Sequence, residues 1–176
     1  APGTAETQSL KSKIQEMKST QVDIPMYIGG KKVYTDEKVS MHPPHETSHN
    51  LGTFNRGNAS HVPAAVDAAL AAKESGANMP WQARAAIFLK AAELLAGPFR
   101  DKMNAATMLA QSKNAMQAEI DAACEMIDFF KFNVQYMSEI YAQQPPENSP
   151  GVWNQLEYRP LEGFVFKKPV ISTNAH

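Results

Sequence analysis

The sequence predicts an α+β fold that is mostly helical, with a β-hairpin near the N-terminus and an extended strand near the C-terminus. Residues 26–34 form two short β-rich runs around the pair Gly29-Gly30, the signature of a tight hairpin turn. Alanine-rich helical sequence begins near Ser60, and residues 99–144 contain neither glycine nor proline. These features predict a β-rich beginning followed by a set of helices that includes one long helix.

Composition sets limits on the class of protein. The chain has 176 residues, 43% of them hydrophobic and 20% charged, which is enough for one globular domain with a core. Its 17 basic and 18 acidic residues give a net charge of -1, so nothing favours nucleic acid or an anionic membrane surface. No apolar stretch is long enough to span a bilayer. The single cysteine excludes an internal disulfide and an all-cysteine zinc site.

The N-terminal part divides into a polar N-terminal arm and a set of short strands. Residues 1–22 form this polar N-terminal arm, with a short amphipathic helix expected over residues 7–19. The hairpin follows, and the sequence favours further short strands near residues 39–41 and 51–54, on either side of the Pro43-Pro44 break.

Two helices are expected before the longest one. The first follows Pro63 and runs over residues 64–73, and the second ends at Gly97-Pro98. The sequence 111–114 marks a break in the next helical stretch, where Asn114 is a plausible cap for the helix that follows.

The long helix, expected over residues 116–141, carries an unusually wide apolar sector. Its main stripe repeats at spacings of 4 and 3: Met116, Ile120, Ala123, Ile127, Phe130, Val134, Met137 and Tyr141. A second stripe lies beside it and consists of Met126, Phe129, Tyr136 and Ile140. A helix with such a sector requires cover from two directions. The two preceding helices can supply only one of them.

Side chains that often carry chemistry are few, and each has a simpler explanation. His42, His45 and His49 have a spacing that resembles a metal site, but Pro43 and Pro44 prevent a helix there and no ligand set is complete. Cys124 lies in mid-helix without a partner base, so a packed small side chain is favoured over a nucleophile. The sequence therefore predicts no catalytic residue, no metal ligand and no cofactor-binding residue.

Acidic side chains on the long helix leave two readings open. Glu125 and Asp128 are three residues apart and can face the same way, as an acid–base pair requires, but a solvated helix face is the simpler reading. No dinucleotide fingerprint, phosphate loop or nucleophile elbow occurs in the sequence.

Four segments resemble one family. The run 23–31 (DIPMYIGGK) is similar to the opening strands of the NAD-dependent aldehyde dehydrogenases, specifically the Δ1-pyrroline-5-carboxylate dehydrogenases. The runs 84–92 (RAAIFLKAA) and 158–165 (YRPLEGFV) resemble the same family, as do QAEIDAA and IDFFKFN within 117–133. The resemblance covers residues 10–166, and it implies an incomplete aldehyde dehydrogenase fold over residues 23–166 followed by a divergent tail at 167–176.

The resemblance also implies which catalytic groups are missing. The family continues into a Pro-Phe-Asn motif whose asparagine stabilises an oxyanion, but here Ser172, or Ile171 after a one-residue slip, stands in that place. The family's nucleotide loop, nucleophilic cysteine and general-base glutamate lie further along its chain, and Cys124 does not correspond to that nucleophile. We therefore expect no enzymatic activity and no bound cofactor.

The expected function is structural. The apolar surface is suited to contact protein that the chain does not encode. Leaving about 500 Å² of it exposed to water would lose about 12 kcal/mol of hydrophobic stabilisation. The leading hypothesis is a non-catalytic subunit of a larger assembly of other proteins, mitochondrial by family resemblance. The alternatives are the N-terminal piece of an active dehydrogenase, and a regulator that docks onto the intact enzyme. The expected partner-binding residues are Ile127, Phe130, Val134, Met137, Tyr141, Tyr158, Phe164 and Phe166.

Overall fold

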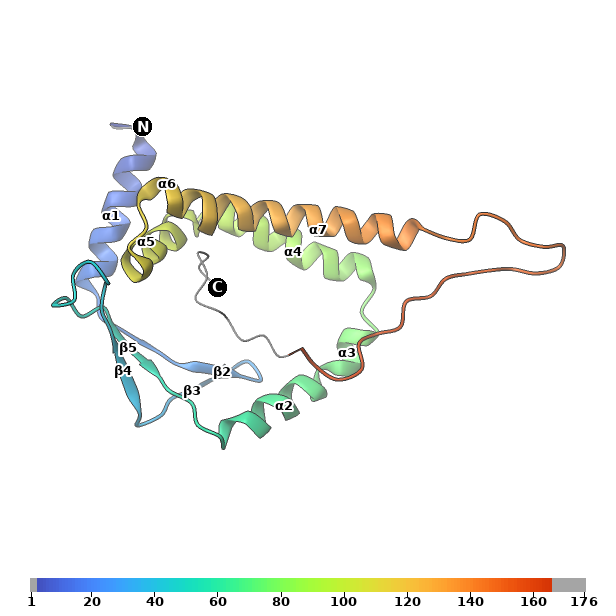
Figure 1. The fold of residues 1–176 in the computed structure, drawn as a ribbon, viewed down its shortest axis with the longest axis horizontal. Coiled ribbons are helices and arrows are strands. Elements are labelled where there is room, and N and C mark those ends of the chain that lie inside the picture. The colour runs from blue at the N-terminus through green and yellow to red at the C-terminus, as the bar shows by residue number, and fades with distance from the viewer. Residues whose placement is uncertain (1–2, 166–176) are drawn as a thin grey trace.

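The structure, a computed structural model, describes residues 3–165 (Figure 1). Helices predominate, as the sequence predicts, whereas the strands of the described residues are all in the N-terminal third. The helices are α1 (Ala5–Ser19), α2 (His61–Ala71), α3 (Lys73–Ala77), α4 (Trp81–Ala96), α5 (Arg100–Gln111), α6 (Ala115–Ala118) and α7 (Glu125–Ala142), with a π-helical segment, η1 (Glu119–Cys124), between the last two. The strands are β1 (Val22–Ile24), β2 (Met26–Ile28), β3 (Lys31–Val33), β4 (Lys38–Met41) and β5 (Gly52–Asn55).

The strands form two small sheets. The predicted hairpin is present: β2 pairs antiparallel with β3, and Gly29 and Gly30 both adopt positive φ in the turn between them. A type I′ turn needs this conformation at both central positions, which explains the two glycines. The second sheet has the order β1-β5-β4, in which β1 runs parallel to β5 and β4 antiparallel to it. Strand β1 adds an element that the sequence analysis did not predict.

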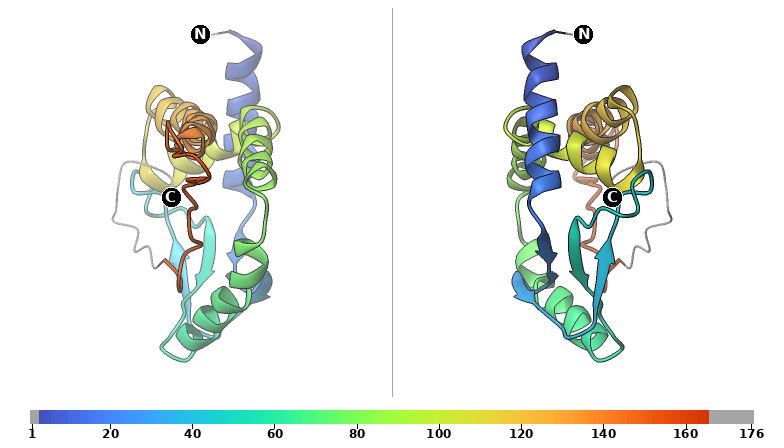
Figure 2. Two further views of the ribbon diagram at one scale, coloured as in Figure 1. Left: turned by 90° about the vertical axis from the view of Figure 1, so that its right-hand side faces the viewer. Right: turned by 90° about the vertical axis from the view of Figure 1, so that its left-hand side faces the viewer.

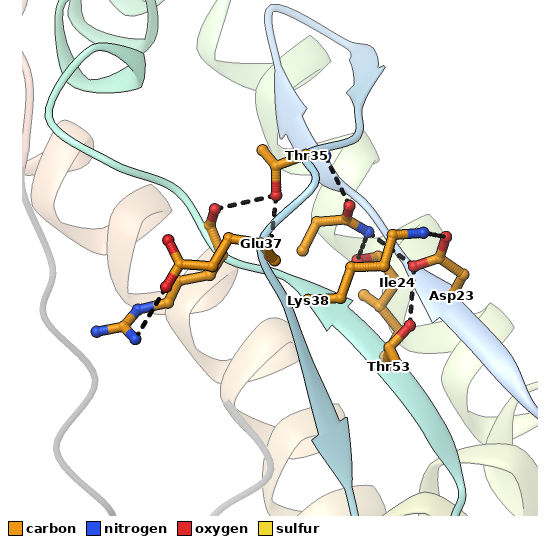
Figure 3. A network of polar contacts seen from close by, with 8 residues as sticks. Asp23, Ile24, Thr35, Glu37, Lys38 and Thr53 are labelled. Atoms are coloured by element: carbon orange, nitrogen blue, oxygen red, sulfur yellow. Dashed lines mark hydrogen bonds and ion pairs between the residues drawn. The ribbon is translucent and has the colours of Figure 1, made fainter.

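A polar network fixes the register of the three-stranded sheet (Figure 3). The buried side chain of Asn55 accepts a hydrogen bond from the backbone N–H of Thr35 at 2.7 Å, and it donates to Asp23 at 2.8 Å and to the Ile24 carbonyl at 2.9 Å. Lys38 pairs with Asp23 at 2.6 Å and lowers the pKa of that carboxyl group. A one-residue slip of any strand would break these contacts, so the network selects one register.

The helical half is built around the antiparallel pair α4 and α7, which lie side by side (Figure 1). Helix α1 packs across α5 at one end of this pair, as Figure 2 shows from both sides. The strands and α2 lie apart from the pair and connect to it through α1 at one end and α3 at the other (Figure 1). None of the helices within residues 3–165 has the length and apolar character that a membrane span requires.

Small residues dominate the core of the helical half. Among the described leucine, isoleucine, valine, methionine and aromatic side chains, only Leu95 and Leu109 are buried. The other buried apolar side chains of the core are alanines, which let the helix backbones approach closely: Ala85, Ala92, Ala105, Ala118, Ala122 and Ala123. We call this set the alanine seam. A seam of alanines buries little apolar area per residue, so the larger side chains remain outside it.

The break between α5 and α6 follows from local side-chain chemistry. Ser112 ends α5 in the left-handed conformation, with φ of 58°. Asn114 then caps α6 as predicted, because its side chain accepts a hydrogen bond from the N–H of Gln117 while the Gln117 side chain accepts one from the N–H of Asn114. This reciprocal arrangement is a capping box. Lys113 forms an ion pair with Asp121 at 2.5 Å and ties the break to the π segment.

The π segment corrects the predicted stripe of the long helix. The helical run is continuous from Ala115 to Ala142, but the N–H of Glu125 bonds to the carbonyl of Ile120, five residues back. A π turn accommodates one extra residue, so the side chains before it lose the register of those after it. Met116 and Ile120, predicted to share the stripe, are accordingly exposed, at 74% and 42%.

After α7 the chain forms an extended excursion, here called the arm (residues 143–165), which projects beyond the helix pair and returns (Figure 1). The predicted C-terminal strand is not formed within the described part of the arm, because no neighbouring strand is available for a ladder. Side-chain amides hold the two legs instead: Gln144 exchanges hydrogen bonds with the backbone of Leu156, at 2.9 and 3.2 Å. The predicted divergent tail, 167–176, lies outside the described residues.

Candidate interaction surface

The main stripe of α7 faces its neighbouring helix. Ile127, Phe130, Val134, Met137 and Tyr141 are all half-buried along the side of α7 that packs on α4. Phe130 meets Phe88 with ring centroids 5.8 Å apart, and Tyr141 stacks on Trp81 at 5.7 Å with nearly parallel planes. The structure therefore brings this part of the predicted surface together within the chain and leaves it only partly accessible.

The predicted residues of the arm are more exposed. Tyr158 reaches back to α7 and places its ring edge-on to Tyr141, with centroids 5.3 Å apart. Tyr158 and Phe164 nevertheless remain 45% and 46% exposed. Phe166, the last of the predicted residues, lies outside the described residues. The structure thus joins Tyr158 to the main stripe and leaves Phe164 away from it.

The more accessible apolar surface is one that the predicted set omits. The second stripe of α7 projects away from α4 and exposes large side chains, so we define the outer stripe as Phe129, Phe132, Tyr136 and Ile140. Phe132 and Tyr136 stack on one another at 6.3 Å. The sequence carries the signal for this stripe, since Phe129, Tyr136 and Ile140 recur at helical spacing, but the main stripe is longer and gives the stronger pattern.

The arm adds a second exposed apolar region. Trp153 is 81% exposed, and Val152, Leu161 and Val165 are also exposed. The Asn148 side chain accepts a hydrogen bond from the N–H of Asn154, which holds the chain on either side of Trp153. Tryptophan is one of the side chains that most often anchor protein interfaces.

The total surface is far larger than a compact chain of this mass would show. The chain exposes 12721 Å² for a mass of 19.3 kDa. The scaling relation for folded monomers gives about 8,500 Å² for this mass, so the excess is about 4,000 Å². Interfaces of obligate assemblies bury about 2,000–5,000 Å² counted over both partners, which is about 1,000–2,500 Å² on each. The excess is therefore larger than the area that one such interface covers on one partner.

A charged cluster marks the start of the long helical run. Arg100 pairs with Glu119, and Asn104, 2% exposed, donates to the same carboxylate at 2.5 Å. Partial burial raises the pKa of Glu119, but the hydrogen bonds from Arg100 and Asn104 outweigh it, so the net pKa is lowered. Glu119 is thus held ionised, as a structural ion pair requires.

Cys124 belongs to the same cluster and is poorly suited to act as a nucleophile. Its thiol donates to Glu119 at 3.5 Å. Desolvation and this carboxylate together raise the pKa of Cys124. A nucleophilic cysteine needs the opposite, a lowered pKa in an electropositive site.

The three loop histidines do not converge. His42 bonds to the carbonyl of His49, His49 to the carbonyl of Lys18, and His45 to the hydroxyl of Ser112, each at 2.8 or 2.9 Å. Each ring thus uses a nitrogen to fasten the loop that follows β4. Within residues 3–165 no group of three or more potential ligands is placed to hold a metal ion.

Comparison with known proteins identifies the fold. The family model described as "Aldehyde dehydrogenase family" matches residues 33–167. The chain belongs to the aldehyde dehydrogenase family. Among curated relatives, Delta-1-pyrroline-5-carboxylate dehydrogenase of Agaricus bisporus is 51% identical over 166 residues, which cover 94% of this chain and 30% of that protein. The mitochondrial human enzyme of the same name is 40% identical over 163 residues, covering 93% and 29% respectively.

Solved structures lead to the same group. The Delta-pyrroline-5-carboxylate dehydrogenase of Mycobacterium tuberculosis, solved with NAD and cobalamin, is 45% identical with a TM-score of 0.90, covering 93% of this chain and 31% of that one. The Thermus enzyme, solved with NAD, is 25% identical with a TM-score of 0.76, covering 86% and 30%. The aldehyde dehydrogenase resemblance of the sequence is thereby confirmed. The chain spans about 30% of the length of the relatives it matches.

The described residues do not form a dinucleotide site of the kind the family implies. A phosphate-binding turn needs several glycines between a strand and a helix N-terminus, where backbone N–H groups meet the phosphates. The connection from β5 to α2 carries only Gly57, and a side chain added there would press on Met26 at 2.8 Å. We therefore derive no hydride-transfer step from residues 3–165.

Proposed function

We propose that this chain is a non-catalytic structural subunit derived from a pyrroline-5-carboxylate dehydrogenase and held within a larger, mitochondrial assembly. The observation that carries the proposal is the open surface, about 4,000 Å² beyond the expectation for a compact monomer. Several of its relatives are named as mitochondrial enzymes, which supports the location.

The exposed side chains support a protein partner in particular. The outer stripe of α7 offers three aromatic rings and an isoleucine along one face, and the arm presents Trp153 and Val152. Interfaces are enriched in aromatic residues, and a face of this kind left in water promotes association. In the proposed assembly other subunits cover the outer stripe and the arm, while the alanine seam holds the chain's own helices in place.

A second candidate function is supported by the degree of similarity. The chain is 51% identical to the Agaricus enzyme over 94% of its length. This favours a piece of an active NAD-dependent pyrroline-5-carboxylate dehydrogenase, in which the remainder of the same polypeptide would cover the outer stripe.

Native mass spectrometry of material purified from its source separates these functions. A 19.3 kDa chain in a stable complex with unrelated subunits supports the structural subunit. Recovery of the same sequence within a polypeptide about three times as long supports the active enzyme. Co-purification with an intact dehydrogenase would instead indicate a regulator of that enzyme, and a solitary, compact 19.3 kDa particle would overturn all three.

An activity assay on the purified chain tests the non-catalytic role. We expect no turnover with NAD and pyrroline-5-carboxylate, and no rise in melting temperature on addition of NAD. The intact enzyme from a relative, assayed in parallel, is the positive control. Saturable NAD binding by the 176-residue chain would contradict the proposed role.

A further inference from the structure

A cavity of about 480 Å³ lies where the returning arm crosses the helices. Its walls come from α2 and α3, the start of α4, the end of α7 and residues 158–163 of the arm. A volume of this size falls within the range of small-molecule sites. The cavity shares Tyr141, Tyr158 and Leu161 with the candidate interaction surface, but its basic side chains have no part in that surface.

The lining of the cavity combines aromatic rings with small residues. Trp81, Tyr141 and Tyr158 form a continuous series of rings, the first two nearly parallel at 11° and the third edge-on to the second at 73°. Helix α3 contributes Gly76 and Ala77 to the same lining, and a Cβ built onto Gly76 would meet open space. Rings that can stack and small residues that leave room make this space, which we call the slot, suited to a flat molecule.

The charge around the slot is one-sided. Lys73, Arg84 and Arg159 line it, and none of the described residues that line it is acidic. The guanidinium group of Arg84 is held in place by the carbonyls of Gly76, at 2.8 Å, and Met79, at 3.5 Å. Lys73 and Arg159 share a single carboxylate, that of Glu162, so the three cations keep an excess of positive charge that can attract an anion.

Glu162 lies at the mouth of the cavity and indicates what the cations accept. Its carboxylate pairs with Lys73 at 2.5 Å and lies 3.8 Å from Arg159, yet it is largely exposed. A carboxylate from the chain itself thus occupies the position where the acidic group of a ligand would bind. An incoming anion would displace it, since an exposed ion pair costs little to separate.

We propose that this cavity binds a small aromatic anion, either an aromatic carboxylate or an aromatic phosphate. The ring packs against the aromatic side chains of the lining, and the acidic group meets Lys73 and Arg159 in place of Glu162. Every group that the proposal uses belongs to residues 69–163 of this chain.

Equilibrium dialysis with two probes, phenyl phosphate and benzoate, tests the proposal on the full-length chain, within its assembly if it is isolated in one. We expect at least one probe to bind with a dissociation constant of about 1 mM or tighter. Inorganic phosphate and phenol, the two halves of the first probe, should each bind at least about tenfold more weakly. The stronger of the two probes identifies the acidic group.

Two substitutions should weaken binding of the aromatic anion, and a third should strengthen it. Lys73→Gln removes a charge-assisted hydrogen bond and should weaken binding about tenfold. Gly76→Met fills the slot without a backbone clash and should abolish binding while the protein remains folded. Glu162→Gln removes the competing carboxylate and should tighten binding severalfold, which loss of structure cannot do.

Lys90→Gln is the matched control, because Lys90 forms a comparable exposed ion pair with Glu93 on α4, away from the cavity. It should leave binding unchanged. The proposal is overturned if neither aromatic probe binds more tightly than its halves, or if Glu162→Gln weakens binding.

Discussion

The β-sheet of the N-terminal third and the helical pair α4–α7 hide their surfaces in different ways. Asn55 satisfies three partners within the sheet, so that region is complete in its polar contacts. Helix α7 buries none of its own side chains fully, although it is rich in aromatic residues. The comparison shows that the sheet satisfies the polar groups of its central asparagine within the chain, whereas α7 leaves its apolar side chains only partly covered. The unfinished part of the fold is therefore its hydrophobic cover.

The largest expected effect comes from the alanine seam, whose side chains are buried between the helices. Ala122 is fully buried, so Ala122→Phe has no space for its ring and should destabilise the protein by about 3 kcal/mol, at the upper end for overpacking. Thermal unfolding measures the loss. Ala83→Phe, at an exposed position of α4, is the control and should change stability by less than about 0.5 kcal/mol. Equal effects at the two sites would contradict a closed seam.

The sheet should respond to the loss of a single amide. Asn55→Ala leaves the Thr35 N–H and the Asp23 carboxylate each without one partner, and we expect a loss of about 2 kcal/mol in the free energy of unfolding. Urea titration is the measurement. Asn133→Ala, on the exposed surface of α7, should be close to neutral. A neutral Asn55→Ala would mean that the network does not hold the sheet.

A substitution in the arm should weaken assembly without changing the stability of the fold. Because Trp153 is so exposed, Trp153→Ala should leave the melting temperature of the isolated chain unchanged. In the proposed assembly the same change should weaken binding by about 2 kcal/mol, the size expected for an aromatic anchor. Titrated co-purification measures it, with Val62→Ala on exposed α2 as the comparison. Unaltered assembly would show that the arm is not covered by a partner.

The smallest effect concerns acid. The pKa of Glu119 is lowered in the folded chain, so the unfolded state binds its proton first and stability should fall as the pH drops below 4.5. The contribution should not exceed about 1 kcal/mol, because the ion pair is partly solvated. Urea titrations at several pH values between about 6 and 3 give the free energy of unfolding at each pH. This free energy should fall less steeply with decreasing pH for Glu119→Gln than for the original chain. The same substitution at exposed Glu139 is the control, and a slope unchanged at Glu119 would contradict the assignment.

Local signals predicted much of the fold. The glycine pair predicted the hairpin, and Asn114 predicted the cap of α6, because both depend on contacts between neighbouring residues. The parallel pairing of β1 with β5 joins residues 30 positions apart, and nothing in the run Val22–Ile24 specifies that partner. The family resemblance was predicted from short segments, and the comparisons confirmed it.

The candidate surface was predicted less completely. Periodicity identified both stripes of α7, but it could not say which stripe would meet α4, since each is apolar. The π segment was also missed, because an extra residue within a helical turn leaves no compositional trace at Glu119–Cys124. Exposure of Trp153 depends on the path of the arm, which only the structure supplies.

The π segment makes the spacing of this helix a matter of count as well as composition. Successive residues of an α-helix are separated by about 100° around the axis. Because the π turn already absorbs one extra residue, a deletion of one residue within 120–124 should let ordinary turns close while Glu119 stays beside Arg100. The same deletion in the middle of α7, where the turns are ordinary, should rotate the side chains on one side of it by that angle relative to those on the other. The helix should therefore tolerate a change of length at the π segment and resist it elsewhere.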